Sequence, residues 1–187
     1  VFAEAIHKGA MPLLRQLDIT IWNNNSNDVG MKAFCDAIGT NSSELGHLQL
    51  NHNNTDEGML AFFSAITPSN VIGPREPKGA LPHLRSLLIE TDMTGNEYGM
   101  FAFLHAITNK ALSELRTLSI HLNHFIKNGT IENSFLTFVD VLKDPATLPA
   151  LGVLSIPEDH RFTLPDPLKI FVEHELRNRN IVIWLGK

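Results

Sequence analysis

The segment Leu115-Arg116-Thr117-Leu118-Ser119-Ile120-His121-Leu122-Asn123 decides the fold of this chain. Its apolar residues follow the order leucine, two residues, leucine, one residue, then leucine or isoleucine. The same spacing recurs four more times, beginning at Leu14, Leu45, Leu84 and Leu151. Alternation of apolar and polar residues over its last four positions is the period of a β-strand. We therefore predict five copies of one strand, and a sixth short strand at 181–183.

A second pattern, Gly-Met-x-Ala-Phe, lies between the copies of the first. It begins at Gly30, Gly58 and Gly99, and Ala-Ile follows each copy at the same offset. Weaker copies cover 2–6, 134–142 and 168–176. Apolar residues recur three and four positions apart in these segments, which is the period of an amphipathic helix. We predict a helix at each of them.

The leucine pattern begins at residues 14, 45, 84, 115 and 151, so the steps are 31, 39, 31 and 36 residues. Parallel strands need a long crossover, which is most often a helix. Alternating strands and helices therefore predict an α/β fold with a parallel sheet. An ordinary α/β sheet alternates in the same way, but it would not repeat Gly-Met-x-Ala-Phe in phase with the leucines.

Two segments, 45–53 and 115–123, resemble the consensus of leucine-rich repeats, including the asparagine at its ninth position. Asp92 and Asp159 stand at that position in two other copies, and Trp22 stands there in the first. In the family, this asparagine bonds the backbone of neighbouring turns. Aspartate accepts such bonds only when it is ionised, and tryptophan cannot accept them.

The helical half and the period near thirty residues resemble the ribonuclease-inhibitor-like class of this family. The resemblance implies an open, curved solenoid, or horseshoe, of about six repeats. Its parallel strands would line the concave face, and its helices would form the convex face. We expect 1–187 to be a single leucine-rich-repeat domain. We also expect it to be a fragment of a longer protein, because the first helix would begin at Phe2 without a polar cap.

The longest step contains an inserted loop, 67–79, whose three prolines and two glycines exclude a continuing helix. A long surface loop costs little entropy, so the insertion can be a tolerated one. It can also be a binding loop beside the concave face. A second irregular stretch is expected from Pro157 to Pro167.

Residues between and after the core leucines of each strand should line the inner sheet face in three rows. The first row holds Gln16, His47, Ser86, Thr117 and Val153. The second holds Asp18, Gln49, Leu88, Ser119 and Ser155. The third holds Thr20, Asn51, Glu90, His121 and Pro157. We predict that the residues of the first four strands bind a partner protein, although the rows lack the aromatic and arginine anchors of tight interfaces.

Arg15, Arg85 and Arg116 each follow the first leucine of a strand, so they should lie along the edge where the helices end. They can form a basic stripe for an acidic partner. Alternatively, their role is local, because Glu114 lies close to Arg116 and cations are favourable near helix C-termini.

The nine histidines suggest a metal site. However, His47 and His121 should lie two strands apart in different rows, and the sequence contains neither His-Glu-x-x-His nor Cys-x-x-Cys. Catalytic motifs are also missing: there is no Gly-x-Ser-x-Gly and no phosphate-binding loop. Ser119, His121 and Asp18 share a face, as any polar strand face would allow. We expect no enzyme, no cofactor and no metal.

These observations favour a protein-protein interaction module that binds through the concave face and edge loops. Resemblance to inhibitor-type and Ran GTPase-activating repeats leaves open a regulator of an enzyme such as a GTPase or hydrolase. A structural segment of a longer solenoid is the third possibility. The net charge of -5 argues against a nucleic-acid partner, and we expect no membrane and no small-molecule substrate.

The single cysteine, Cys35, excludes a disulfide within the chain and favours a cytoplasmic location. We expect no signal peptide, because the first residues lack a basic start and a long apolar run. Asn-x-Ser/Thr sequons at Asn24, Asn41, Asn53 and Asn128 would be accessible to glycosylation if the protein were secreted, and this alternative stays open.

Overall fold

The computed structural model of the chain describes residues 2–9, 11, 13–21, 27–41, 44–52, 56–67, 81–91, 98–121, 130–157 and 166–186. Six parallel strands are described: β1 (Gln16–Ile21), β2 (His47–His52), β3 (Ser86–Thr91), β4 (Thr117–His121), β5 (Val153–Ile156) and β6 (Val182–Leu185). The α-helices are α1 (Phe2–His7), α2 (Asn27–Asn41), α3 (Asp56–Ile66), α4 (Tyr98–Thr108), α5 (Thr130–Lys143) and α6 (Asp166–Leu176). A short 3₁₀ helix, η1 (Arg177–Arg179), precedes β6. The predicted alternation of helices and strands is confirmed.

The six strands form one open sheet in chain order, from β1 at one edge to β6 at the other. The core leucines are in register across it, with Leu17, Leu48, Leu87, Leu118, Leu154 and Ile183 aligned. The sheet hydrogen bonding begins one residue before each strand. The carbonyl of Arg15, for example, accepts from the amides of Gly46 (2.9 Å) and His47 (3.0 Å). The leucine pattern therefore sets the register, because each strand enters the sheet at the same repeat position.

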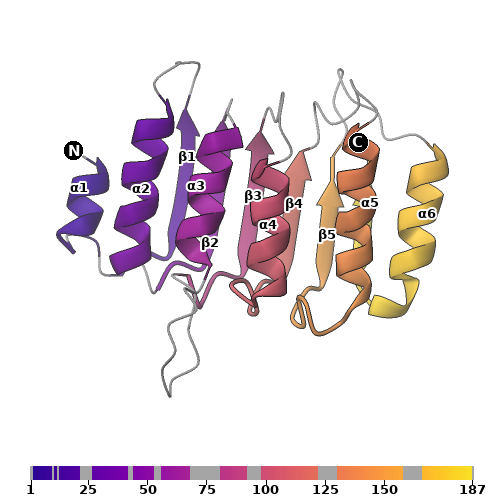
Figure 1. Cartoon of the computed structure of the whole chain (residues 1–187). Coiled ribbons are helices and arrows are strands. Elements are labelled where there is room, and N and C mark those ends of the chain that lie inside the picture. Colours follow the sequence, from indigo (N-terminus) through magenta and orange to yellow (C-terminus); the bar gives the residue numbers. More distant parts are fainter. Residues whose placement is uncertain are drawn as a thin grey trace.

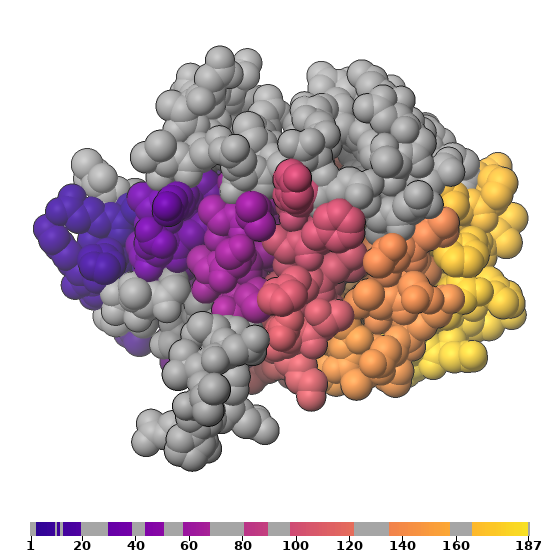
Figure 2. Space-filling view, viewed as in Figure 1, coloured from indigo at the N-terminus to yellow at the C-terminus, as the bar shows by residue number. Residues whose placement is uncertain are grey.

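All six described helices lie on one face of the sheet (Figure 1), and helices that follow each other along the chain pack side by side. Figure 2 shows the outer side of this helix layer, in which consecutive units succeed one another from the N-terminal to the C-terminal end. No described helix lies on the opposite face of the sheet. The described part of the chain is therefore a two-layer α/β structure with one sheet face left open.

The core fills the space between the sheet and the helices, and it explains the Gly-Met-x-Ala-Phe pattern. The methionine and the phenylalanine lie one helical turn apart, and both are buried in α2, α3 and α4. The residue directly after the methionine is exposed in each copy. In α4, Phe101 is 51% exposed, whereas Phe103 is 1% exposed. The rings of Phe63, Phe103 and Phe138 follow one another through α3, α4 and α5, with centroids 4.7 and 5.7 Å apart. This aromatic series links three successive units in one core.

The structure refines the expected bounds of the last strand and of the irregular stretch before α6. The last strand begins one residue later than predicted and ends two residues later, at Val182 and Leu185. The expected irregular stretch ends before Pro167, because α6 begins at Asp166 and proline is tolerated in a first helical turn. Of the expected insertion 67–79, only Thr67 lies within the described residues, where its hydroxyl donates to the carbonyl of Phe63. The positions expected to carry the asparagine ladder, among them Trp22 and Asn53, lie outside the described residues.

Candidate functional site

The sheet face that no described helix covers is the candidate site, and we call it the open sheet face. Alternation along each strand turns one set of residues into the core and leaves the other set on this face. The strand register confirms the first two predicted rows through β5: Gln16, His47, Ser86, Thr117 and Val153, then Asp18, Gln49, Leu88, Ser119 and Ser155. Their side chains are half-buried or exposed. Their role in binding stays a prediction.

The third row is placed by its backbone. Thr20, Asn51, Glu90 and His121 are aligned on β1 to β4. Among these four, only the side chain of His121 is described, and it is half-buried. Pro157 lies directly after β5 and outside the strand pairing.

Two side chains contact the carboxylate of Asp18 at the β1 edge of the face. Gln16 Nε2 donates to Asp18 Oδ2 over 3.4 Å, and His47 Nε2 lies 3.4 Å from Asp18 Oδ1. His47 is aligned with Gln16, so its contact with Asp18 runs diagonally between β1 and β2. The spacing within one strand cannot reveal such a contact. Asp18 remains exposed, so its carboxylate can also accept a hydrogen bond from a partner.

The last strand adds two residues that the sequence interpretation left out of the rows. Val182 is aligned with Val153 and Trp184 with Ser155, so both continue the first two rows onto β6. Val182 is 54% exposed and Trp184 is 61% exposed. The expectation that the rows lack an aromatic residue is therefore wrong at β6. Its signal in the sequence is weak, because residues 181–185 are all apolar and show no polar alternation.

The register separates the residues that a catalytic or metal site would need. Asp18 lies on β1 and Ser119 on β4, three strand spacings or about 14 Å apart. His47 and His121 lie on β2 and β4, in different rows. Among the described residues, no three His, Cys, Asp or Glu side chains come together in a group that could hold a metal ion. Cys35 lies buried in α2, and burial raises the pKa of its thiol to about 12.

The arginines expected at one edge lie directly before β1, β3 and β4, and all three are exposed. Glu114 lies among them, 3.9 Å from Arg85 Nε and 3.4 Å from His83 Nδ1. These contacts favour the local alternative for Arg85, because a nearby carboxylate offsets part of its charge.

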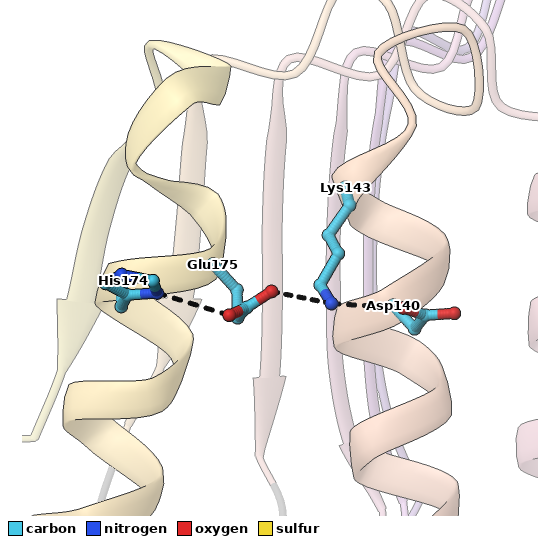
Figure 3. Close-up of polar contacts among 4 residues, drawn as sticks. All are labelled: Asp140, Lys143, His174 and Glu175. Carbon is cyan, nitrogen blue, oxygen red and sulfur yellow. Dashed lines mark hydrogen bonds and ion pairs between the residues drawn. The ribbon is translucent and has the colours of Figure 1, made fainter.

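A polar cluster joins α6 to α5 and so helps to place β6 beside β5 (Figure 3). Lys143 Nζ lies 2.6 Å from Glu175 Oε2 and 3.1 Å from Asp140 Oδ1. His174 Nδ1 lies 3.2 Å from the other Glu175 oxygen. The pKa of the Glu175 carboxyl is lowered, mainly by the hydrogen bond from Lys143 and next by the hydrogen bond from His174. The pKa of Lys143 is raised, mainly by its hydrogen bond to Glu175 and next by its hydrogen bond to Asp140.

A second contact between these units comes from η1, which is separated from β6 by Asn180 and Ile181. Arg179 donates from Nη1 to the carbonyl of Asp144 (2.6 Å) and from Nη2 to the carbonyl of Leu148 (2.9 Å). These carbonyls belong to the turns after α5, where they also accept from the amides of Thr147 and Leu151. The planar guanidinium bonds both carbonyls at once. Arg179 therefore anchors the segment that carries Val182 and Trp184.

Comparison with known proteins adds no relative. No protein-family model matches this sequence, and no curated protein matches it. Within the described ranges, each helix is too short or too polar to cross a membrane. The fold and the open sheet face therefore carry the functional argument.

Proposed function

We propose that this chain is a leucine-rich-repeat module of the ribonuclease-inhibitor-like class that binds another protein through its open sheet face and the adjoining loops. Its geometry supports a curved solenoid. Neighbouring strands lie about 4.8 Å apart, whereas packed helices need about 8–10 Å. One strand and one helix per unit therefore favour a sheet that bends with its strands inside. Such curvature would make the open sheet face concave.

The observation that carries this proposal is the pair of side-chain rows that cross all six strands on a face that no described helix covers. On β1 to β4 these rows consist mainly of amide, hydroxyl and imidazole groups, which donate and accept hydrogen bonds. A wide surface of this kind is suited to a protein partner. A small substrate would need a concave pocket with convergent groups.

Affinity capture from a lysate of the source cells tests the proposal, with the captured proteins quantified by mass spectrometry. One variant changes the open sheet face by His47→Ala, Gln49→Ala and Thr117→Ala together. The matched control changes three exposed residues of α2, α3 and α4 by Lys32→Ala, Ser64→Ala and His105→Ala. Both variants are first checked for an unchanged circular dichroism spectrum and thermal midpoint.

We expect the open-face variant to lose a specific partner at least about tenfold, which is a loss of about 1.4 kcal/mol, while the control variant retains it. Capture that is equal for the open-face variant and the wild type would place binding on another surface. Equal loss in both variants would show that the captured proteins do not recognise a defined face.

A further inference from the structure

The open sheet face differs at its two ends, and this difference points to the chemistry of its partner. We propose that the face binds a partner segment that places a lysine or arginine over β1 and a large apolar side chain over β6. This inference rests on the proposed function and adds the partner's chemistry and its direction along the sheet.

The apolar end of the face lies on β5 and β6. Trp184 and Val182 are 61% and 54% exposed, and the register places Val153 directly beside Val182. Tryptophan is among the residues that contribute most to protein interfaces. An exposed indole next to two valines therefore offers an anchor for an aliphatic or aromatic side chain.

The opposite end of the face carries the carboxylate of Asp18. Asp18 lies on β1, and the predicted rows contain neither lysine nor arginine. The side chain of Asp18 is 53% exposed and can accept from a partner cation beside its contacts with Gln16 and His47. Charge complementarity favours a basic segment here, and the chain's net charge of -5 acts in the same direction.

The register also fixes the spacing. Asp18 and Trp184 occupy the same row, five strand-to-strand steps apart, which is about 24 Å along the sheet. A partner helix would span this distance with about 16 residues, and an extended segment would span it with about seven. The basic and apolar residues of the partner should therefore be separated by one of these two intervals.

Selection from a phage-displayed library of random 20-residue peptides tests the inference, because a peptide of this length allows both intervals. The whole chain is the target, and enriched peptides are synthesised and titrated by fluorescence anisotropy. Five variants are compared: Trp184→Ala, Trp184→Phe, Asp18→Asn, the triple variant of His47, Gln49 and Thr117 described above, and the control Phe101→Ala. Phe101 is a comparably exposed aromatic residue on the outer side of α4. The unfolding midpoint of each variant shows that it folds.

We expect enriched peptides to carry a lysine or arginine and a large apolar residue at one of the two intervals. Trp184→Ala should weaken their binding at least about tenfold, and Trp184→Phe should restore most of it. Asp18→Asn should weaken binding about three- to tenfold at low salt and less at high salt, because the lost contact is electrostatic. Phe101→Ala should change affinity less than about twofold.

The remaining outcomes overturn the inference, and they separate it from the proposed function. If binding of the peptides depends on His47, Gln49 and Thr117 but not on Trp184 or Asp18, the open sheet face still binds a partner. The inference that its two ends select a basic and an apolar residue would then be wrong. Enrichment of acidic residues, or of no common sequence, would show that the face does not select a basic and apolar segment. Enriched peptides that no open-face substitution affects would overturn both.

Discussion

Replacing Phe103 by alanine tests whether successive helices share one continuous core. Phe103 lies in α4 and is 1% exposed. Its ring centroid lies 4.7 Å from that of Phe63 in α3 and 5.7 Å from that of Phe138 in α5. Removing the ring therefore removes packing between three neighbouring units at once.

The expected cost is about 4 kcal/mol in the free energy of unfolding, within the range of about 3–5 kcal/mol typical of buried Phe→Ala substitutions. Aromatic neighbours on both sides of Phe103 favour the upper half of that range. Domains are commonly stable by only about 5–15 kcal/mol, so the loss should be large. The matched control is Phe101→Ala, two residues earlier in the same helix, where the ring is 51% exposed. Its cost should stay within about 0.5 kcal/mol.

Urea unfolding followed by far-UV circular dichroism measures both costs. The comparison requires that the slope of the unfolding free energy against urea concentration is the same in each variant. A cost below about 1.5 kcal/mol for Phe103→Ala would refute the tightly packed aromatic series, since a well-packed Phe→Ala costs more. Equal costs for the two variants would refute the assignment of their helix faces. A smaller slope would indicate that the units on either side unfold separately.

The further predictions concern three side chains, those of Cys35, Arg179 and Glu175. Because burial raises the pKa of Cys35 to about 12, a thiol reagent at about pH 8 should label the unfolded chain and spare the folded one; rapid labelling of the folded chain would contradict this. As the pH rises, the thiol of Cys35 ionises in the unfolded chain before it ionises in the folded chain. The free energy of unfolding should therefore fall as the pH rises from 9.0 toward 12. Cys35→Ser should remove this part of the pH dependence. Arg179→Lys loses a two-pronged donor to two carbonyls and should cost about 1–2 kcal/mol in urea unfolding; an unchanged midpoint would refute the anchoring role. Lys143 lowers the pKa of Glu175 from 4.5, so their contact should stabilise the fold above pH 4.5 and be lost as the pH falls through the lowered value. Unfolding measured across acidic pH should show a smaller acid dependence for Glu175→Gln, and an identical dependence would count against the contact.

Much of the site could be predicted because the strand pattern is local. In each of the five copies, the leucine spacing gives the core residues, and alternation then gives the residues of the opposite face. Identical strand patterns in successive units align at the same position, so the rows of side chains follow from the same spacing. The residues Gln16, His47, Ser86 and Thr117 could therefore be placed in one row from the sequence.

The contacts within the rows could not be predicted in the same way. The diagonal contact between Asp18 and His47 depends on the stagger of two strands that lie about thirty residues apart in the sequence. Side-chain rotamers decide whether such neighbours meet, and spacing does not contain them.

The sequence by itself determined the alternation of strands and helices, the core of each unit and the order of the polar rows, because these depend on periods of two and of 3.6 residues within short segments. Only the tertiary structure decided the apolar end of the open sheet face. Residues 181–185 are uniformly apolar, so they do not indicate which of them face the helices. Trp184 faces outward because β6 pairs with β5 in one register. Lys143, Glu175 and Arg179 help to hold that unit in place through contacts between segments more than thirty residues apart.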